Sequence, residues 1–464
     1  MSDAAPRQGL WALLREALTG SEENVATGPL SRAVPLLAIP MALEMATEAL
    51  FVVVDVYFVA KLGAHAVAAV GLTESLLSLV YAVAFGLAMP TTALVARRVG
   101  EGDHPGASVS ASQAVGMALV LGVLIAGTAL FAPSLLALMG ADAQVQAEGA
   151  GFTALSLLTA PAVMLLFTSA AVFRGAGDPR RAMRALWLAN GLNIVLDPCL
   201  IFGWGPFPEL GLSGAAVATA VGRGVGVVYL LAHMWRGPVV RLAEALRVDL
   251  DVLGRLVRLA VGGTLQHLVE TGSWVAMVRI AAELGSVAVA AYTVATRLIM
   301  FTLLPAWGFS NATATLVGQS LGEKDPARAE RAVWISGLYC TPFLGLISLA
   351  FLLTPEQVAG LFTQEPEVRD TAARGLFVVG LGYLFYGWQM VTQQAFNGAG
   401  DTTTPARVNV ACFWGVQVPL GWYLALHTDM GISGIFAAAA TAYTVAAFVG
   451  VVLVRRGRWK TVDV

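Results

Sequence analysis

The two halves of the chain repeat each other, and this duplication constrains the fold more than any other feature of the sequence. Four segments of the first half return in the second half in the same order, at offsets of 220 to 223 residues. The pairs begin at Lys61 and Glu283 (KLGAHAVAA, ELGSVAVAA), Leu94 and Leu316 (LVARRVGEGD, LVGQSLGEKD), Phe173 and Phe396 (FRGAGD, FNGAGD), and Gly211 and Gly431 (GLSG, GISG). The sequence therefore predicts two units of similar structure.

The composition places both units in a membrane. Charged residues make up 12% of the chain, hydrophobic residues 57%, and the mean hydropathy is +0.73, whereas about a quarter of a soluble protein is charged. Twelve apolar stretches reach the length of about 20 residues that crosses a bilayer. Their approximate bounds are 34–60, 67–96, 107–139, 147–172, 182–204, 211–235, 253–281, 287–318, 329–353, 370–395, 406–427 and 432–454. We expect an all-α integral membrane protein with twelve transmembrane helices.

The distribution of basic residues predicts the orientation. With both termini in the cytoplasm, 22 of the 28 lysine and arginine residues fall in cytoplasmic segments and three in outer loops, as the positive-inside rule requires. Six spans return the chain to its starting side, so the repeats run in parallel, as two six-helix lobes around a central cavity. No signal peptide is evident, and we expect a multi-pass protein of the inner (plasma) membrane. The expected segments are a cytoplasmic N-terminal segment (1–33), an N-lobe (34–235), a cytoplasmic linker (236–252), a C-lobe (253–454) and a cytoplasmic tail (455–464).

The first span carries three carboxylates on one face. At about 100° per residue, Glu48 lies roughly 40° and Asp55 roughly 20° around the helix from Glu44, over a length of about 16 Å. A charged side chain in hydrocarbon costs roughly 2.5–3.5 kcal/mol on insertion scales, so this face does not point at lipid. Two interpretations remain: the stripe lines a cavity, or individual acids pair with an arginine of another helix.

The fifth and sixth spans add polar side chains that fit the same site. Asn193 and Asp197 are four residues apart on one helix face, and Pro198 frees a backbone carbonyl near Asp197. Asp197 and Asp55 both lie towards the outer ends of their spans, so we expect them at one depth. Thr219 offers a hydroxyl from the sixth span. Asparagine and threonine in helices also serve as packing contacts, so a structural role stays open for both.

The spans of the second half carry a different set of polar and aromatic side chains. Glu270 is the repeat counterpart of Glu48, with Gln266 and Trp274 one turn to either side on the same face. A carboxyl group beside an aromatic ring suits an organic cation, and it equally suits a proton. The tenth span has aromatic and amide residues, among them Tyr386 and Gln389, and no acid beyond Asp370 at its first position. It is either a cavity wall or a packing surface. We interpret His267 as a packing residue.

Motifs of soluble catalysis are absent. The sequence contains no H-E-x-x-H, G-x-S-x-G or G-x-x-x-x-G-K-[ST] pattern and no Cys/His metal spacing. We therefore predict no enzymatic activity and no cofactor. Because the chain lacks a nucleotide-binding loop, any transport must draw on an ion gradient.

The chain resembles the multidrug and toxic compound extrusion (MATE) exporters. The motifs that carry the resemblance span about residues 30–455 and include LAIPMALEMATEALFVVVDVYFVAKLGAHAVAAVGL, GLAMPTTALVARRVGEGD, FRGAGDPRRA, NIVLDPCLIFGWGP and GLSGAAVAT. The resemblance implies two six-helix lobes, alternating access, and efflux of amphipathic organic cations in exchange for H⁺ or Na⁺.

The same resemblance implies roles for individual residues. Asp55 matches the first-helix acid, Asn193 and Asp197 match the fifth-helix N-x-x-x-D-P pair, and Thr219 matches the sixth-helix hydroxyl of the DinF-like N-lobe ion site. Glu270 matches the seventh-helix glutamate of the NorM-like branch. The tenth-helix acid of that branch is replaced here, with Tyr386 nearest its position, so a complete C-lobe Na⁺ site is not implied. Glu44 and Glu48 are additional acids that favour cationic substrates.

The sequence thus predicts a secondary active multidrug exporter. We expect H⁺ or Na⁺ as the coupling ion, with no metal other than Na⁺ at Asp55 and Asp197. We expect the lipid bilayer and small amphipathic cations as partners, no nucleic acid, and a monomer. The candidates for a substrate or second ion site are Glu270, Glu48, Glu44, Gln266, Trp274, Tyr386 and Gln389. The alternatives are a lipid-linked saccharide flippase of the same superfamily, typically with a more basic cavity, and an intramembrane enzyme.

Overall fold

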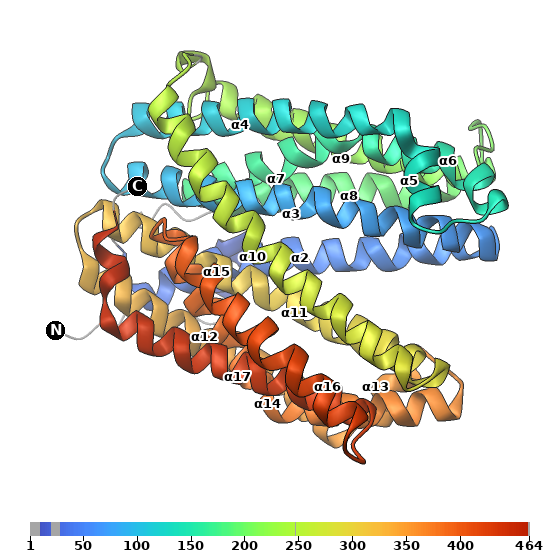
Figure 1. The fold of residues 1–464 in the computed structure, drawn as a ribbon. Helices are drawn as coiled ribbons and strands as arrows, with labels where there is room; N and C mark the ends of the chain where they lie inside the picture. Colours follow the sequence, from blue (N-terminus) through green and yellow to red (C-terminus); the bar gives the residue numbers. More distant parts are fainter. Residues whose placement is uncertain (1–9, 20–27, 246, 463–464) are drawn as a thin grey trace. The chain divides into compact units, whose positions relative to one another are not determined.

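The computed structural model describes residues 10–19, 28–245 and 247–462 (Figure 1), all in helices and their connections. The first repeat contains α2 (Leu30–Ala60), α3 (Ala64–Gly100), α4 (His104–Ala126), η1 (Gly127–Phe131), α5 (Ala132–Leu138), α6 (Ala143–Leu158), α7 (Ala160–Gly175), α8 (Pro179–Phe202) and α9 (Leu212–Trp235). The second contains α10 (Leu250–Glu283), α11 (Ser286–Gly322), α12 (Pro326–Leu353), α13 (Pro355–Gly360), α14 (Pro366–Gly398), α15 (Thr403–Asn409), the π-helix η3 (Val410–Gln417), α16 (Val418–Leu426) and α17 (Ile432–Arg456). Three further elements are α1 (Leu10–Thr19), η2 (Leu242–Glu244) and η4 (Arg458–Thr461).

Twelve helical segments of the described chain match the bounds of the twelve expected spans to within a few residues. Ten helices of the described chain are long and apolar enough to cross a membrane by themselves. The other two spans are α10 and the continuous segment α15–η3–α16, whose three parts are each short. The fourth span is interrupted at Thr159, because Pro161 in the first turn of α7 has no N–H to continue the helix of α6. Parts of the expected terminal segments (1–9, 20–27 and 463–464) and residue 246 of the linker lie outside the described residues.

The duplication is visible in the backbone as well as in the sequence. Glycines with positive φ recur at equivalent positions, with nearly equal angles: Gly63 and Gly285 (106° and 103°), Gly177 and Gly400 (83° and 85°), and Gly211 and Gly431 (55° and 53°). Lys324, at φ 61°, stands where the first repeat has Gly102, at φ 73°. Glycine adopts this region without the steric cost that a side chain adds. The second repeat therefore keeps the same turn at the cost of placing a lysine in an unfavourable backbone conformation.

The compact units are shifted from the sequence repeats. One unit, the N-unit, comprises Leu43–Thr264, and the other, the C-unit, comprises Met1–Ala42 and Leu265–Val464. The boundaries fall inside α2 and α10, the first helix of each repeat, so each of these helices begins in one unit and ends in the other. In the N-unit α3 packs against α7 and α8 against α9, and in the C-unit α14 packs against α11, α12 and α17. Figure 1 labels these helices.

Two equivalent glycines allow this exchange of helix ends. In the N-unit, a Cβ atom on Gly86 of α3 would lie 2.6 Å from the backbone nitrogen of Thr264 in α10. In the C-unit, a Cβ atom on Gly308 of α11 would lie 2.4 Å from the carbonyl oxygen of Met41 in α2. The start of each repeat's first helix therefore packs against the second helix of the other repeat at a site without a side chain.

Gly308→Ala is expected to destabilise the C-unit by roughly 1–3 kcal/mol, because the added methyl group overlaps the backbone of α2 and pushes the helices apart. The measurement is the midpoint of thermal unfolding in detergent. Gly116→Ala is the control, since a Cβ atom there meets nothing within 4 Å. Equal midpoints for the two variants would show that this contact does not hold the helices together.

The linker between α9 and α10 is attached to the N-unit. The Gln113 side chain of α4 donates to the carbonyl oxygen of Arg247 at 2.7 Å, and Ser108 Oγ accepts from the backbone N–H of Arg241 at 3.0 Å. Val240 and Leu242 are buried. These contacts fix the point at which α10 begins.

Candidate functional site

Two aspartates of the N-unit, on α2 and α8, lie within electrostatic range of each other. Asp55 is half-buried, and Asp197 is completely buried. One carboxylate oxygen of each, Oδ1, is buried and has no hydrogen-bond donor in the described part of the chain. Burial of charged oxygens without donors is costly, so this pair is suited to share a cation or a proton.

Asn193 and Thr219 extend the same site from α8 and α9. In the amide orientation that satisfies both ends of Asn193, its nitrogen donates to Asp197 Oδ2 at 2.8 Å and its oxygen accepts from Thr219 Oγ1 at 2.9 Å. The site therefore has two acids, one amide and one hydroxyl, drawn from three helices. The four residues expected to bind the coupling ion (Asp55, Asp197, Asn193, Thr219) lie in one unit, and their role as ion ligands stays a prediction.

Glu44 and Glu48 are ion-paired. Glu44 Oε1 accepts from Arg174 Nη1 of α7 at 2.6 Å, with side chains 1% and 8% exposed. Glu48 Oε1 accepts from Arg223 Nη2 of α9 at 2.8 Å, with side chains 14% and 3% exposed. Of the two interpretations left open by the sequence, the structure shows pairing for these two acids. Of the acidic stripe, Asp55 alone has no cationic partner in the described residues.

Arg223 and its surroundings were not anticipated from the sequence, because a lone arginine in an apolar span gives no indication of its partner. The guanidinium group also donates to the hydroxyl oxygen of Tyr81 of α3 at 3.1 Å. It lies 5.6–5.8 Å from the ring centres of Phe51, Tyr81 and Phe167, an arrangement that stabilises a cation. Glu74 of α3 was also missed; it lies within electrostatic range of Asp55.

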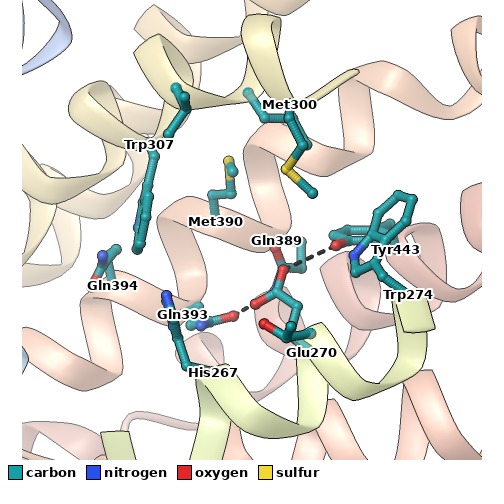
Figure 2. Close-up of a pocket in the computed structure, with 13 residues that line it drawn as sticks. His267, Glu270, Trp274, Met300, Trp307, Gln389, Met390, Gln393, Gln394 and Tyr443 are labelled. Carbon is teal, nitrogen blue, oxygen red and sulfur yellow. Dashed lines mark hydrogen bonds between the residues drawn. The ribbon is translucent and has the colours of Figure 1, made fainter. Parts of the chain in front are cut away.

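The C-unit contains a pocket of about 170 Å³ lined by α10, α11, α14 and α17 (Figure 2). Trp307 and Trp274 stand on opposite sides of it, with Glu270 between them. The lining residues are His267, Glu270, Thr271, Trp274, Met300, Leu303, Leu304, Trp307, Gln389, Met390, Gln393, Gln394 and Tyr443. The pocket therefore combines apolar and aromatic walls with one carboxylate, a composition typical of small-molecule sites.

Glu270 is the acid of this pocket. Tyr443 of α17 donates its hydroxyl hydrogen to Glu270 Oε1 at 2.9 Å (Figure 2). Among the described residues no salt bridge joins this carboxyl group to a lysine, arginine or histidine side chain. His267, which the sequence analysis assigned to packing, lines the same pocket and stacks on Trp307 with ring centres 5.3 Å apart.

A chain of six side-chain amides begins in the wall of the pocket, where Gln389, Gln393 and Gln394 lie, and continues into the protein behind it. Its hydrogen bonds join Asn311 to Gln394 (2.6 Å), Gln394 to Asn397 (3.1 Å), Asn397 to Gln266 (3.1 Å), Gln266 to Gln393 (3.2 Å) and Gln393 to Gln389 (2.5 Å). The amides come from α10, α11 and α14. They supply polarity without charge to the α14 side of the pocket, where no acid of α14 is among the lining residues.

The expected substrate candidates of the C-unit separate into two groups. Glu270, Trp274 and Gln389 line the pocket. Gln266 is fully buried and does not line the pocket, but it accepts a hydrogen bond from Gln393, which does. Tyr386 is also fully buried, stacked on Tyr443 with ring centres 3.9 Å apart. The sequence cannot separate these groups, because side chains on one helix face differ in depth once neighbouring helices cover them.

The comparisons with known proteins agree with this architecture. The sequence model of the MatE family matches residues 40–199 and again residues 264–423, once in each repeat. The chain belongs to the MatE family. Proteins of this family are transporters and not enzymes, and this MatE protein is a multi-pass membrane protein.

Relatives and solved structures resemble this MatE protein over most of its length. It is 25% identical to the probable multidrug resistance protein YoeA of Bacillus subtilis, over 89% of this chain and 91% of the relative. It is also 25% identical to a FAD transporter of Shewanella oneidensis, over 89% and 92% of the two chains. A crystal structure of MATE in complex with MaL6 superposes with a TM-score of 0.88 at 26% identity, over 93% and 97% of the two chains. The structure of a MOP superfamily transporter from Pyrococcus furiosus superposes with a TM-score of 0.88 at 26% sequence identity, over 95% of this chain and 98% of that chain.

Proposed function

We propose that this MatE protein is a secondary active multidrug exporter that moves amphipathic organic cations out of the cell in exchange for H⁺ or Na⁺. Several relatives are named multidrug resistance proteins, which supports export of drugs. The same proposal places the protein in the inner membrane as a monomer, with both termini in the cytoplasm.

The observation that carries the coupling mechanism is the pair of donor-free carboxylate oxygens on Asp55 and Asp197. Two acids in a site poor in water cannot both stay ionised without a cation or a proton between them. Occupation of the site therefore changes which conformation is preferred, and antiport requires such a change. A gradient supplies about 1.4 kcal/mol per pH unit and about 2.3 kcal/mol per 100 mV for each charge, enough to drive export against a concentration difference.

The C-unit pocket supports the choice of cationic substrates. Glu270 supplies a carboxyl group that forms no salt bridge with a described basic residue, and Trp274, Trp307 and Tyr443 supply aromatic surfaces. Attraction between a cation and both a carboxylate and a ring face favours planar, singly charged organic cations over anions. A lipid-linked saccharide carries phosphate groups, which this carboxylate repels.

Glu270→Gln is expected to weaken binding of ethidium to the purified transporter by at least about tenfold, because it removes the charge that attracts the dye. Fluorescence anisotropy of the dye in detergent measures the affinity. Glu356→Gln is the matched control, since Glu356 is exposed at the start of α13 in the same unit. Unchanged affinity in Glu270→Gln would show that ethidium does not bind in this pocket through Glu270.

A further inference from the structure

Two contacts of the first repeat recur in the second repeat at equivalent positions but with different chemistry. Glu44 corresponds to Gln266, and Arg174 corresponds to Asn397 within the repeated segment FRGAGD/FNGAGD. The ion pair between Glu44 and Arg174 (2.6 Å) is thus replaced by a hydrogen bond between Gln266 and Asn397 (3.1 Å). The contact is kept although both charges are lost, which shows that the register between the two repeats holds at the level of side chains.

The second contact lies one turn further along the first helix of each repeat. Glu48 and Glu270 each lie 15 residues before the equivalent glycines Gly63 and Gly285. Arg223 and Tyr443 each lie 12 residues after the equivalent glycines Gly211 and Gly431. The two pairs therefore occupy equivalent positions in the two repeats, and the members of each pair are hydrogen-bonded to each other.

The partners of the two glutamates differ in charge. Arg223 donates to Glu48 at 2.8 Å, and Tyr443 donates to Glu270 at 2.9 Å. The two hydrogen bonds are nearly equal in length, but the first pairs a glutamate with a cationic side chain and the second pairs a glutamate with a neutral hydroxyl group. Of the two, Glu270 lines the C-unit pocket.

We propose that Tyr443 is the specificity-determining residue of the C-unit pocket: it orients Glu270 by a neutral hydrogen bond and leaves its charge available to a cationic substrate, where the other repeat neutralises the glutamate with an arginine. This inference rests on the proposed function, since it assumes that the pocket binds substrate. It assigns cation selectivity to the sixth helix of the repeat and not to Glu270 alone.

The surroundings of Tyr443 suit this role. Its ring is held by Tyr386 at 3.9 Å and Phe413 at 4.9 Å between ring centres, so the hydroxyl group has a fixed direction towards Glu270 (Figure 2). The counterpart Arg223 is also enclosed by aromatic rings. An arginine at position 443 would therefore meet the same kind of environment, and it would pair with Glu270 as Arg223 pairs with Glu48.

The test compares two probes on the purified full-length transporter, the cation ethidium and the neutral dye N-phenyl-1-naphthylamine. In Tyr443→Arg the ratio of ethidium affinity to neutral-dye affinity is expected to fall by at least about tenfold, because the introduced charge neutralises Glu270. In Tyr443→Phe, which keeps the ring and removes only the hydroxyl group, the ratio is expected to change less than about threefold. A loss of packing alone would affect both dyes and leave the ratio unchanged.

The outcomes separate this inference from the proposed function. If Glu270→Gln lowers the ratio and Tyr443→Arg does not, the pocket binds cations and the role of Tyr443 is wrong. If Glu270→Gln leaves the ratio unchanged, both the proposed pocket and this inference fail. Should Tyr443→Arg not elute as a folded protein, Tyr443→Lys introduces the same charge and takes its place. A fall in Tyr443→Phe as large as in Glu270→Gln would overturn the inference, because that variant introduces no charge beside Glu270.

Discussion

Arg174→Met is expected to lower the free energy of unfolding by about 3–5 kcal/mol, because it leaves a charged Glu44 buried without its partner. Both side chains are at least nine-tenths buried, and their contact joins α2 to α7. The long apolar side chain of methionine fills much of the same space, so the loss reports on the charge and less on packing. Unfolding in mixed detergent micelles, followed by size-exclusion chromatography, measures the effect.

Two further variants control this result. Arg180→Met breaks a partly exposed ion pair with Asp178 in the same unit and is expected to cost less than about 1 kcal/mol. The double variant Glu44→Gln/Arg174→Asn copies the neutral pair that Gln266 and Asn397 form in the second repeat, and it is expected to recover most of the loss. If Arg174→Met is as stable as Arg180→Met, the buried pair does not hold these helices together.

Asp197→Asn and Asp55→Asn are each expected to reduce dye efflux from cells at least about tenfold. Each variant removes one of the two charges whose neutralisation by H⁺ or Na⁺ links ion binding to the change of conformation. Ethidium binding to the purified protein is expected to stay within about threefold of wild type, because the proposed substrate pocket lies in the other unit. Efflux is measured by dye accumulation, and binding by fluorescence anisotropy.

Glu209→Gln is the matched control for these aspartates, since it removes an exposed carboxylate between α8 and α9. It is expected to leave efflux unchanged. Loss of efflux together with an equal loss of dye binding in Asp197→Asn would mean that the site binds substrate and not the coupling ion. Full efflux in both aspartate variants would show that neither Asp55 nor Asp197 is needed to bind the coupling ion.

The fold followed closely from the sequence. Repeated segments and long apolar stretches predicted the twelve spans because both signals are local, and the bounds differ from the structure by only a few residues. The N-unit site could also be predicted from the sequence. Asn193 and Asp197 share a helix face, and the resemblance to MATE exporters linked them to Asp55 and Thr219. In the amide orientation that satisfies both ends of Asn193, its side chain joins those of Asp197 and Thr219 by hydrogen bonds.

The contacts between side chains of different helices could not be predicted from the sequence. Helical periodicity shows that Glu44, Glu48 and Asp55 share a face, but it does not show that Arg174 and Arg223 neutralise two of them. The shift of the compact units into α2 and α10 has the same origin. It depends on close approach at Gly86 and Gly308, which no periodic pattern records.

The most direct test of ion coupling uses everted membrane vesicles energised to an acid interior. Addition of ethidium to wild-type vesicles is expected to release protons and collapse the pH gradient, and Asp55→Asn is expected to abolish this response. If dye-dependent exchange requires Na⁺, the coupling ion is sodium and the same residues are its proposed ligands. If the dye produces no exchange with either ion, the protein is not an exporter of organic cations, and a lipid-linked flippase becomes the better explanation.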